Sequence, residues 1–299
     1  MTKKKQITLL LLVLAVLLAA YLGLKAYNDW SYKKEAEKTS ENLTVTDLNT
    51  DNIRTIRYTD GSDTVAFEKK NGVWYYTADE ALPLKQSCAE EAVSSFCGVT
   101  GSRKLSHGDS ADDYGLSEPS YTVVLTDAKG KETEVDIGNS TGSDYYLTAD
   151  GGATIYTVSS TILDSLIFDT DSMIQNETFP DIDSPTLNSF TVKQNGKTLV
   201  SCSGDDEDLS SYGSELSGIS LDTCVNYKAG SQELEQYGLD QKTRKEMTAV
   251  YEDSDKEKTQ TFYMGTVFTE EDTDYAYMQL EGSEMVYKVF VSDVEKILN

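Results

Sequence analysis

The side chains that most often carry enzyme chemistry are few in this sequence or lack a catalytic context. His107 is the single histidine, and its neighbours in residues 106–109 predict an exposed turn. No Gly-x-x-x-x-Gly-Lys loop occurs, so the chain is not expected to hydrolyse nucleotides. Carboxylates are so numerous that a glycosidase-like pair could be drawn almost anywhere, which makes such a pair uninformative. We therefore expect a protein that is not an enzyme and that binds no cofactor.

Two acidic clusters, residues 205–208 and 270–274, offer oxygen ligands of the kind that calcium prefers. Neither cluster has the Asp-x-Asp-x-Asp-Gly order of a known calcium loop. Runs of adjacent charges usually mark solvated loops. We expect no metal site at either cluster, and cation binding there is the alternative.

Four cysteines could form disulfides if the chain is exported. Cys88 and Cys97 fall on one predicted helix, where their spacing separates them by about 13 Å along the axis, too far to bridge. A bond between Cys202 and Cys224 is feasible, and four buried free thiols are an equal alternative. Because no Cys-x-x-Cys pair occurs, we expect no zinc site.

Nineteen tyrosines raise the idea of an aromatic platform for sugars or peptides. The tyrosines that suggest it are Tyr75, Tyr76, Tyr145, Tyr146, Tyr275 and Tyr277. Alternation along strands explains them more simply, because one neighbour of each pair would face the core and the other the solvent. A structural role is therefore expected, with ligand binding as the alternative.

The N-terminal segment predicts a membrane anchor. Three lysines at residues 3–5 precede an uncharged apolar run at residues 7–24, which as a helix would reach about 27 Å, close to the thickness of a bilayer core. A cleaved signal peptide is the alternative, although the small residues that a cleavage site needs are poorly placed. The leading lysines favour a cytoplasmic N-terminus, and further lysines beyond the run oppose it. We expect a single-pass protein of the cell membrane with an extracytoplasmic C-terminal part.

The charge of the chain restricts its partners. The formal net charge is −25 at pH 7, from 26 basic and 51 acidic residues. Nucleic acid would be repelled by such a surface, so we expect no nucleic-acid partner. Acidic exported domains also need no partner for solubility, and the charge alone therefore does not indicate a ligand.

Hydrophobic patterning after the polar stalk at residues 28–42 predicts strands with few helices. Residues 53–76 read as a three-stranded meander with turns at Asp60-Gly61 and Asn71-Gly72. A helix is expected over residues 84–98, strands over 121–126, 133–137, 144–148 and 154–158, and a short helix over 161–168. Tyr114-Gly115-Leu116 begins a turn in which glycine permits a positive φ and the two side chains cover a core edge.

The second half of the chain repeats this order. Leu187, Phe190, Val192 and Leu199 repeat the spacing of Ile53, Ile56, Tyr58 and Val65, and Tyr237-Gly238-Leu239 corresponds to Tyr114-Gly115-Leu116. Tyr277 corresponds to Tyr146, and Val294 and Ile297 correspond to Leu163 and Leu166. Such ordered recurrence predicts a duplicated unit, with the boundary near residues 176–184.

Several of these segments carry a family resemblance. They are the lysine-led anchor, the strand at residues 45–50, the Gly-Val-Trp-Tyr-Tyr strand at residues 72–76 and the Asp-Tyr-Gly-Leu-Ser-Glu-Pro turn at residues 113–119. Together they resemble the bacterial family known as domain of unknown function 4340. The second Tyr-Gly-Leu departs from the pattern, because no proline follows it. The resemblance implies an anchored envelope protein associated with exporters of the ATP-binding-cassette type.

The sequence thus predicts an α+β protein in four parts: a cytoplasmic tip and transmembrane helix at residues 1–27, a stalk at 28–42, and repeated units at 43–178 and 179–299. Each unit is expected to contain antiparallel hairpins with one or two helices. The leading functional hypothesis is a non-enzymatic interaction or accessory protein, in contact with the bilayer through residues 7–24 and with an envelope or exporter protein. The alternative is a surface receptor that binds a glycan, a peptide or a divalent cation between the units.

Overall fold

The computed structural model describes Lys25, residues 43–105 and residues 110–298. The described part forms two compact units, each built on one antiparallel sheet. The described residues of unit 1 fall within Met1–Ala78 and Gln86–Phe168, and those of unit 2 within Asp79–Lys85 and Asp169–Asn299. The predicted α+β class therefore needs refinement, since both units are mostly β with few helices.

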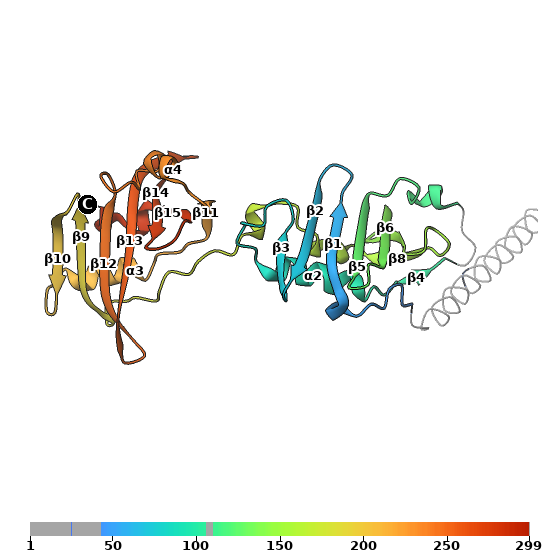
Figure 1. The fold of residues 1–299 in the computed structure, drawn as a ribbon, viewed down its shortest axis with the longest axis horizontal. Coiled ribbons are helices and arrows are strands. Elements are labelled where there is room, and N and C mark those ends of the chain that lie inside the picture. The colour runs from blue at the N-terminus through green and yellow to red at the C-terminus, as the bar shows by residue number, and fades with distance from the viewer. Residues whose placement is uncertain (1–24, 26–42, 106–109, 299) are drawn as a thin grey trace, which may run out of the picture. The chain divides into compact units, whose positions relative to one another are not determined.

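Unit 1 contains an eight-stranded sheet in the order β3-β2-β1-β5-β6-β7-β8-β4 (Figure 1). Its strands are β1 (Ile53–Thr59), β2 (Thr64–Lys70), β3 (Val73–Tyr76), β4 (Arg103–Lys104), β5 (Tyr121–Asp127), β6 (Glu132–Thr141), β7 (Asp144–Thr148) and β8 (Tyr156–Ser159). Its helices are α2 (Gln86–Cys97) and the 3-10 helices η1 (Thr50–Asn52), η2 (Ala111–Tyr114) and η3 (Ser160–Ser165). The predicted meander and the four later strands are confirmed. The helix expected over residues 161–168 is a 3-10 helix.

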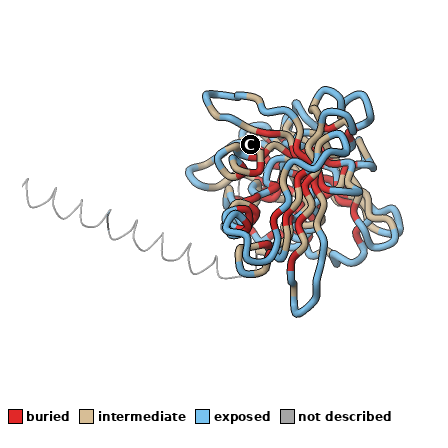
Figure 2. The backbone as a smooth tube through the Cα atoms, turned by 90° about the vertical axis from the view of Figure 1, so that its left-hand side faces the viewer, coloured by how far each residue is buried: buried red, intermediate tan, exposed pale blue. Residues whose placement is uncertain are grey.

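The core of unit 1 forms between the sheet and α2, which packs against β1 and β5. Alternation along β1 buries Ile56 and Tyr58, and Ile53 is also buried because the register shifts between Ile53 and Thr55. The predicted apolar stripe of α2 is confirmed, because all of its members are buried: Cys88, Ala92, Val93, Phe96 and Cys97. Figure 2 shows buried residues along the strands and exposed residues at the loops and hairpin ends.

Unit 2 contains a seven-stranded sheet in the order β10-β9-β12-β13-β14-β15-β11. Its strands are β9 (Leu187–Gln194), β10 (Lys197–Ser203), β11 (Thr223–Asn226), β12 (Lys245–Asp253), β13 (Lys256–Glu270), β14 (Thr273–Leu280) and β15 (Val286–Phe290). Its helices are α3 (Leu209–Leu216), α4 (Ser231–Gln236), α5 (Glu295–Leu298), η4 (Asp171–Met173) and η5 (Val291–Asp293).

The two sheets have the same topology once β3 is set aside. The order β2-β1-β5-β6-β7-β8-β4 in unit 1 becomes β10-β9-β12-β13-β14-β15-β11 in unit 2. In both units a helix follows the first hairpin, and a four-stranded antiparallel run completes the sheet. The repeat inferred from residue spacing therefore extends to strand order and connectivity.

One predicted correspondence between the repeats is wrong. Leu187, Phe190 and Val192 are buried, as are their counterparts on β1. Leu199, however, is 48% exposed, because a bulge in β10 shifts the register and places Val200 opposite Val192. An extra residue in one strand breaks the alternation of side chains between the two faces.

No helix in the described ranges is both long and apolar enough to cross a bilayer. The predicted anchor at residues 7–24 and the stalk at 28–42 lie outside the described residues.

Candidate functional site

The two Tyr-Gly-Leu turns have the same geometry in both units. Gly115 and Gly238 adopt left-handed conformations with φ of 70° and 66°. Leu116 and Leu239 follow them and are buried. The carbonyl oxygen of Tyr114 faces β6, and the carbonyl oxygen of Tyr237 faces β13.

Each of these strands passes the tyrosine carbonyl so closely that only glycine fits at the point of contact. A Cβ on Gly138 would lie 2.2 Å from the carbonyl oxygen of Tyr114, and a Cβ on Gly265 would lie 2.2 Å from that of Tyr237. In unit 2 the backbone amide of Thr266 also donates to the Tyr237 carbonyl at 2.9 Å. Each turn is thus held against a bulge in the central strand, β6 or β13.

The tyrosine of each turn also packs on a second tyrosine, as the predicted correspondence of Tyr146 and Tyr277 requires. The rings of Tyr114 and Tyr146 are 4.6 Å apart, and those of Tyr237 and Tyr277 are 4.7 Å apart. Both contacts join the turn to the third strand of the four-stranded run, β7 or β14. This pair belongs to the common fold of the repeats.

In unit 2 the aromatic contacts continue beyond this pair. The ring of Tyr277 stacks on Phe268 at 4.3 Å, Phe268 stacks on Tyr275 at 5.7 Å, and Tyr275 contacts Phe290 at 5.0 Å. With Tyr237 these residues form a continuous row that we call the aromatic ladder. It begins beside a buried cluster under α4 and ends at Phe290, which is 49% exposed.

Unit 1 has no such row at the equivalent positions. In the strand pairing, Phe268 faces Tyr275 and Tyr275 faces Phe290. The corresponding residues of unit 1, which pair in the same way, are Thr141, Asp144 and Ser159. The repeated fold therefore accepts polar side chains at these three positions, and the outer rings of the ladder are specific to unit 2.

The hairpin that carries the ladder also has an acidic end. Relative to unit 1 it is extended by the pairs Thr269–Asp274 and Glu270–Thr273. The extension and its turn bear the carboxylates that we call the acidic tip: Glu270, Glu271, Asp272 and Asp274. Lys288 forms an ion pair with Glu270, which raises the pKa of this lysine, and its Nζ lies 4.8 Å above the ring of Tyr275.

The aromatic residues that the sequence singles out make up only part of the aromatic ladder. Tyr275 and Tyr277 were candidates for an aromatic platform, whereas Phe268 and Phe290 were not recognised. The signal that could have found Phe268 is its position opposite Tyr275 across the turn at Glu271-Asp272. The other tyrosine pairs do not divide into core and solvent neighbours as expected, because Tyr75, Tyr76, Tyr145 and Tyr146 are all half-buried.

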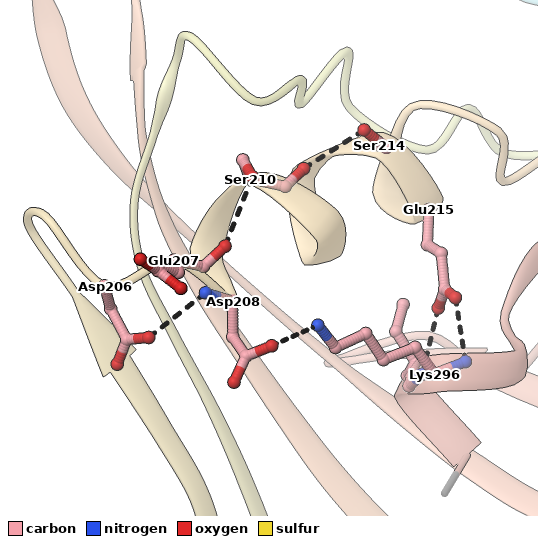
Figure 3. A network of polar contacts seen from close by, with 8 residues as sticks. Asp206, Glu207, Asp208, Ser210, Ser214, Glu215 and Lys296 are labelled. Atoms are coloured by element: carbon pink, nitrogen blue, oxygen red, sulfur yellow. Dashed lines mark hydrogen bonds and ion pairs between the residues drawn. The ribbon is translucent and has the colours of Figure 1, made fainter.

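The first acidic cluster is engaged in contacts within unit 2 (Figure 3). The Asp206 side chain accepts the backbone amide of Asp208 at 3.1 Å, and Asp208 in turn accepts the Lys296 Nζ at 2.6 Å. The Glu215 carboxylate accepts the backbone amides of Lys296 at 2.8 Å and Ile297 at 2.9 Å. These contacts join α3 to the first turn of α5. No group of three or more metal-ligating side chains occurs in the part of the chain that the structure describes.

The four cysteines are free thiols. Of the two alternatives for Cys202 and Cys224, the structure has free thiols and no bond, because β10 and β11 are the two edges of the seven-stranded sheet. At the usual spacing of neighbouring strands, these edges are about 29 Å apart. Burial raises the pKa of Cys97 and of Cys224 to about 11, which disfavours the reactive thiolate.

A Gly-x-Ser-x-Gly motif, the pattern found at the nucleophile of many hydrolases, occurs at residues 138–142, which read Gly-Asn-Ser-Thr-Gly. A nucleophile elbow of this pattern requires a sharp turn from a strand into a helix. Here Ser140 lies within β6 and pairs with Tyr145 across an antiparallel hairpin. His107, the single histidine of the chain, lies outside the described residues. The serine motif therefore lacks the backbone geometry of a hydrolase elbow.

Comparison with known proteins gives one family. The model of the family described as "Domain of unknown function (DUF4340)" matches residues 74–215 and residues 203–297. Neither the curated proteins nor the solved structures give a match. The two matched ranges together cover well over half of the chain. The chain therefore belongs to the DUF4340 family of domains of unknown function.

Proposed function

We propose that this protein is a non-enzymatic accessory protein of the cell envelope. In this proposal, residues 7–24 anchor the chain in the membrane and both units lie outside the cytoplasm, where they bind another envelope protein. The family resemblance suggests an exporter of the ATP-binding-cassette type as the class of partner. The protein would contribute binding and positioning, and the partner would contribute the chemistry.

The observation that supports this proposal most is the difference between the two repeats. A duplicated fold serves as its own reference, since positions that only stabilise the fold should accept similar residues in both copies. The ladder positions of unit 2 instead carry Phe268, Tyr275 and Phe290 where unit 1 carries polar residues. Solvent-accessible aromatic side chains are typical of protein–protein contact surfaces.

The remaining chemistry agrees with a binding role. The cysteine thiols with raised pKa are poor nucleophiles, and Asp208 of the first acidic cluster is engaged in joining α3 to α5. A net charge of −25 favours partners with a basic surface over nucleic acid or anionic lipid.

Crosslinking from outside the cytoplasmic membrane tests this proposal. Protoplasts that produce the full chain with a C-terminal affinity tag are treated with a membrane-impermeant, amine-reactive crosslinker, and the adducts are purified and identified. We expect a covalent adduct with an integral membrane protein, absent from cells treated with quenched reagent. Recovery of the chain alone from treated cells, or recovery from the soluble cytoplasmic fraction, would contradict the proposal.

A further inference from the structure

We propose that the outer face of β13, β14 and β15 is a docking surface for a basic, apolar polypeptide segment of the partner. This inference rests on the proposed function and specifies the chemistry of the binding site. The surface consists of the aromatic ladder and the acidic tip.

The ladder and the tip occur together only in unit 2. The hairpin extension that supplies the acidic tip follows directly after the position of Phe268, and unit 1 ends its equivalent hairpin at Thr141 and Asp144. Unit 1 therefore has neither the outer rings nor the extension. Two features that the fold does not require therefore lie next to each other, because the acidic tip closes the β13–β14 hairpin that carries Phe268 and Tyr275.

The stacking of the rings favours a peptide over a sugar. Phe268 stacks on both Tyr277 and Tyr275, with interplanar angles of 18° and 27°. Sugars bind aromatic residues through exposed ring faces, and the Phe268 ring already stacks on two neighbouring rings. The ladder instead offers ring edges and the 49% exposed side chain of Phe290, which can be buried by aliphatic side chains.

The charge next to the ladder selects a basic partner. The acidic tip contributes four carboxylates, and the lysine beside it, Lys288, is already paired with Glu270. A second copy of this chain would bring an identical acidic tip to the interface, and like charges there would oppose association. Lysine or arginine side chains of a partner would instead find exposed carboxylates at Glu271 and Asp272 and aromatic rings for cation–π contact.

Peptide binding to the full chain in phosphatidylcholine nanodiscs tests this assignment. The probe is a fluorescein-labelled ten-residue peptide of alternating leucine and lysine, and its anisotropy is corrected with empty nanodiscs. The test variant gives unit 2 the residues of unit 1: Phe268→Thr, Tyr275→Asp and Phe290→Ser. Leu199→Ser, which removes another exposed apolar side chain of unit 2, is the matched control.

We expect the triple variant to raise the Kd at least tenfold and Leu199→Ser to change it less than twofold. The triple variant adds one negative charge, so purely electrostatic binding of a basic peptide would not weaken. An unchanged Kd in the triple variant would therefore overturn the assignment. Displacement of the peptide by a chitin hexasaccharide would also overturn the assignment and would indicate a glycan site instead.

A second variant leaves every ring in place. Glu271→Lys with Asp272→Lys reverses the charge of the turn. We expect this variant to raise the Kd of the basic peptide at least fivefold and to bind the matched leucine–glutamate peptide. Equal affinity of the wild type for both peptides would refute charge selection. If a membrane partner is crosslinked but neither variant changes peptide binding, the docking surface is refuted and the proposed function is retained.

Discussion

At the scale of single residues, the strongest constraint in this protein is a repeated close approach of two backbones. Gly138 and Gly265 each pass so near a tyrosine carbonyl oxygen that a Cβ would stand 2.2 Å from it. Real Cβ atoms do not occupy such positions, so one of the two segments would have to move. The same contact in both units makes these glycines a condition of the repeated fold.

We therefore expect Gly138→Ala and Gly265→Ala each to lower the free energy of unfolding by about 1–3 kcal/mol, the usual cost of overpacking. Gly98→Ala is the matched control, since its Cβ would meet no atom within 4 Å. Urea denaturation followed by circular dichroism measures the change. Equal stability of Gly265→Ala and Gly98→Ala would show that the Tyr-Gly-Leu turn can move away from the strand at little cost.

At the scale of secondary-structure elements, the hairpin turns show how far local sequence signals reach. Asn71-Gly72 and Asn195-Gly196 are left-handed two-residue turns, as their residue types predict. Ser254-Asp255 and Glu271-Asp272 adopt the same left-handed conformations without a glycine. A residue with a Cβ costs roughly 1–2 kcal/mol in this region, so here the pairing of the flanking strands overrides local preference.

The turn between β12 and β13 can accordingly be improved. Replacing Ser254 by Asn and Asp255 by Gly should raise the stability of unit 2 by about 1 kcal/mol, because Asn-Gly adopts this turn with little strain. The reverse exchange in the turn between β9 and β10, Asn195→Ser with Gly196→Asp, should lower stability by a similar amount. Thermal unfolding of the two variants measures both effects, and shifts of the same sign would contradict the expectation.

At the scale of the whole molecule, each unit has one fully buried tyrosine with a hydrogen-bonded hydroxyl, at different positions of the repeat: Tyr58 lies on β1 and Tyr287 on β15. The Tyr58 hydroxyl donates to the Ile167 carbonyl at 2.6 Å in unit 1. The Tyr287 hydroxyl accepts the Glu177 amide at 2.8 Å and contacts the Met285 sulfur in unit 2. Burial raises the pKa of both hydroxyls above the ordinary value of 10.0.

This burial makes the stability of both units sensitive to alkali. A raised pKa in the folded state means that the stabilisation is complete below about pH 10 and is lost as the pH rises toward the folded-state pKa, because the unfolded chain ionises first. The loss can reach about 1.4 kcal/mol per pH unit for each tyrosine. We expect Tyr58→Phe and Tyr287→Phe to be less stable at neutral pH and to show a flatter decline between pH 10 and 11. Tyr145→Phe serves as the control, and parallel profiles for all four proteins would refute this account.

Much of the architecture could be predicted because its signals are local. The meander of unit 1 follows from alternation on β1 and the Asn71-Gly72 turn, and α2 follows from the helical spacing of Cys88, Ala92 and Phe96. The correspondence of Tyr146 with Tyr277 also survives in three dimensions, since both pack on the turn tyrosine of their unit.

Local signals do not reach the features that pairing between strands decides. Leu199 is exposed because of a bulge that is defined only by the register of β10 on β9. Cys202 and Cys224 remain apart because the order of strands places β10 and β11 at opposite edges of the sheet. Phe268 joins the ladder because β13 brings it opposite Tyr275.

The sequence by itself determined the family, the repeat, the acidic charge and most strand positions, since these depend on residue type and on spacing within a few residues. Only the tertiary structure decided which side chains meet across the sheet. It assembled Phe268, Tyr275 and Phe290 into one surface and left their counterparts in unit 1 polar. The physical reason is that contacts between strands depend on register and strand order, which the cooperative packing of a whole unit establishes.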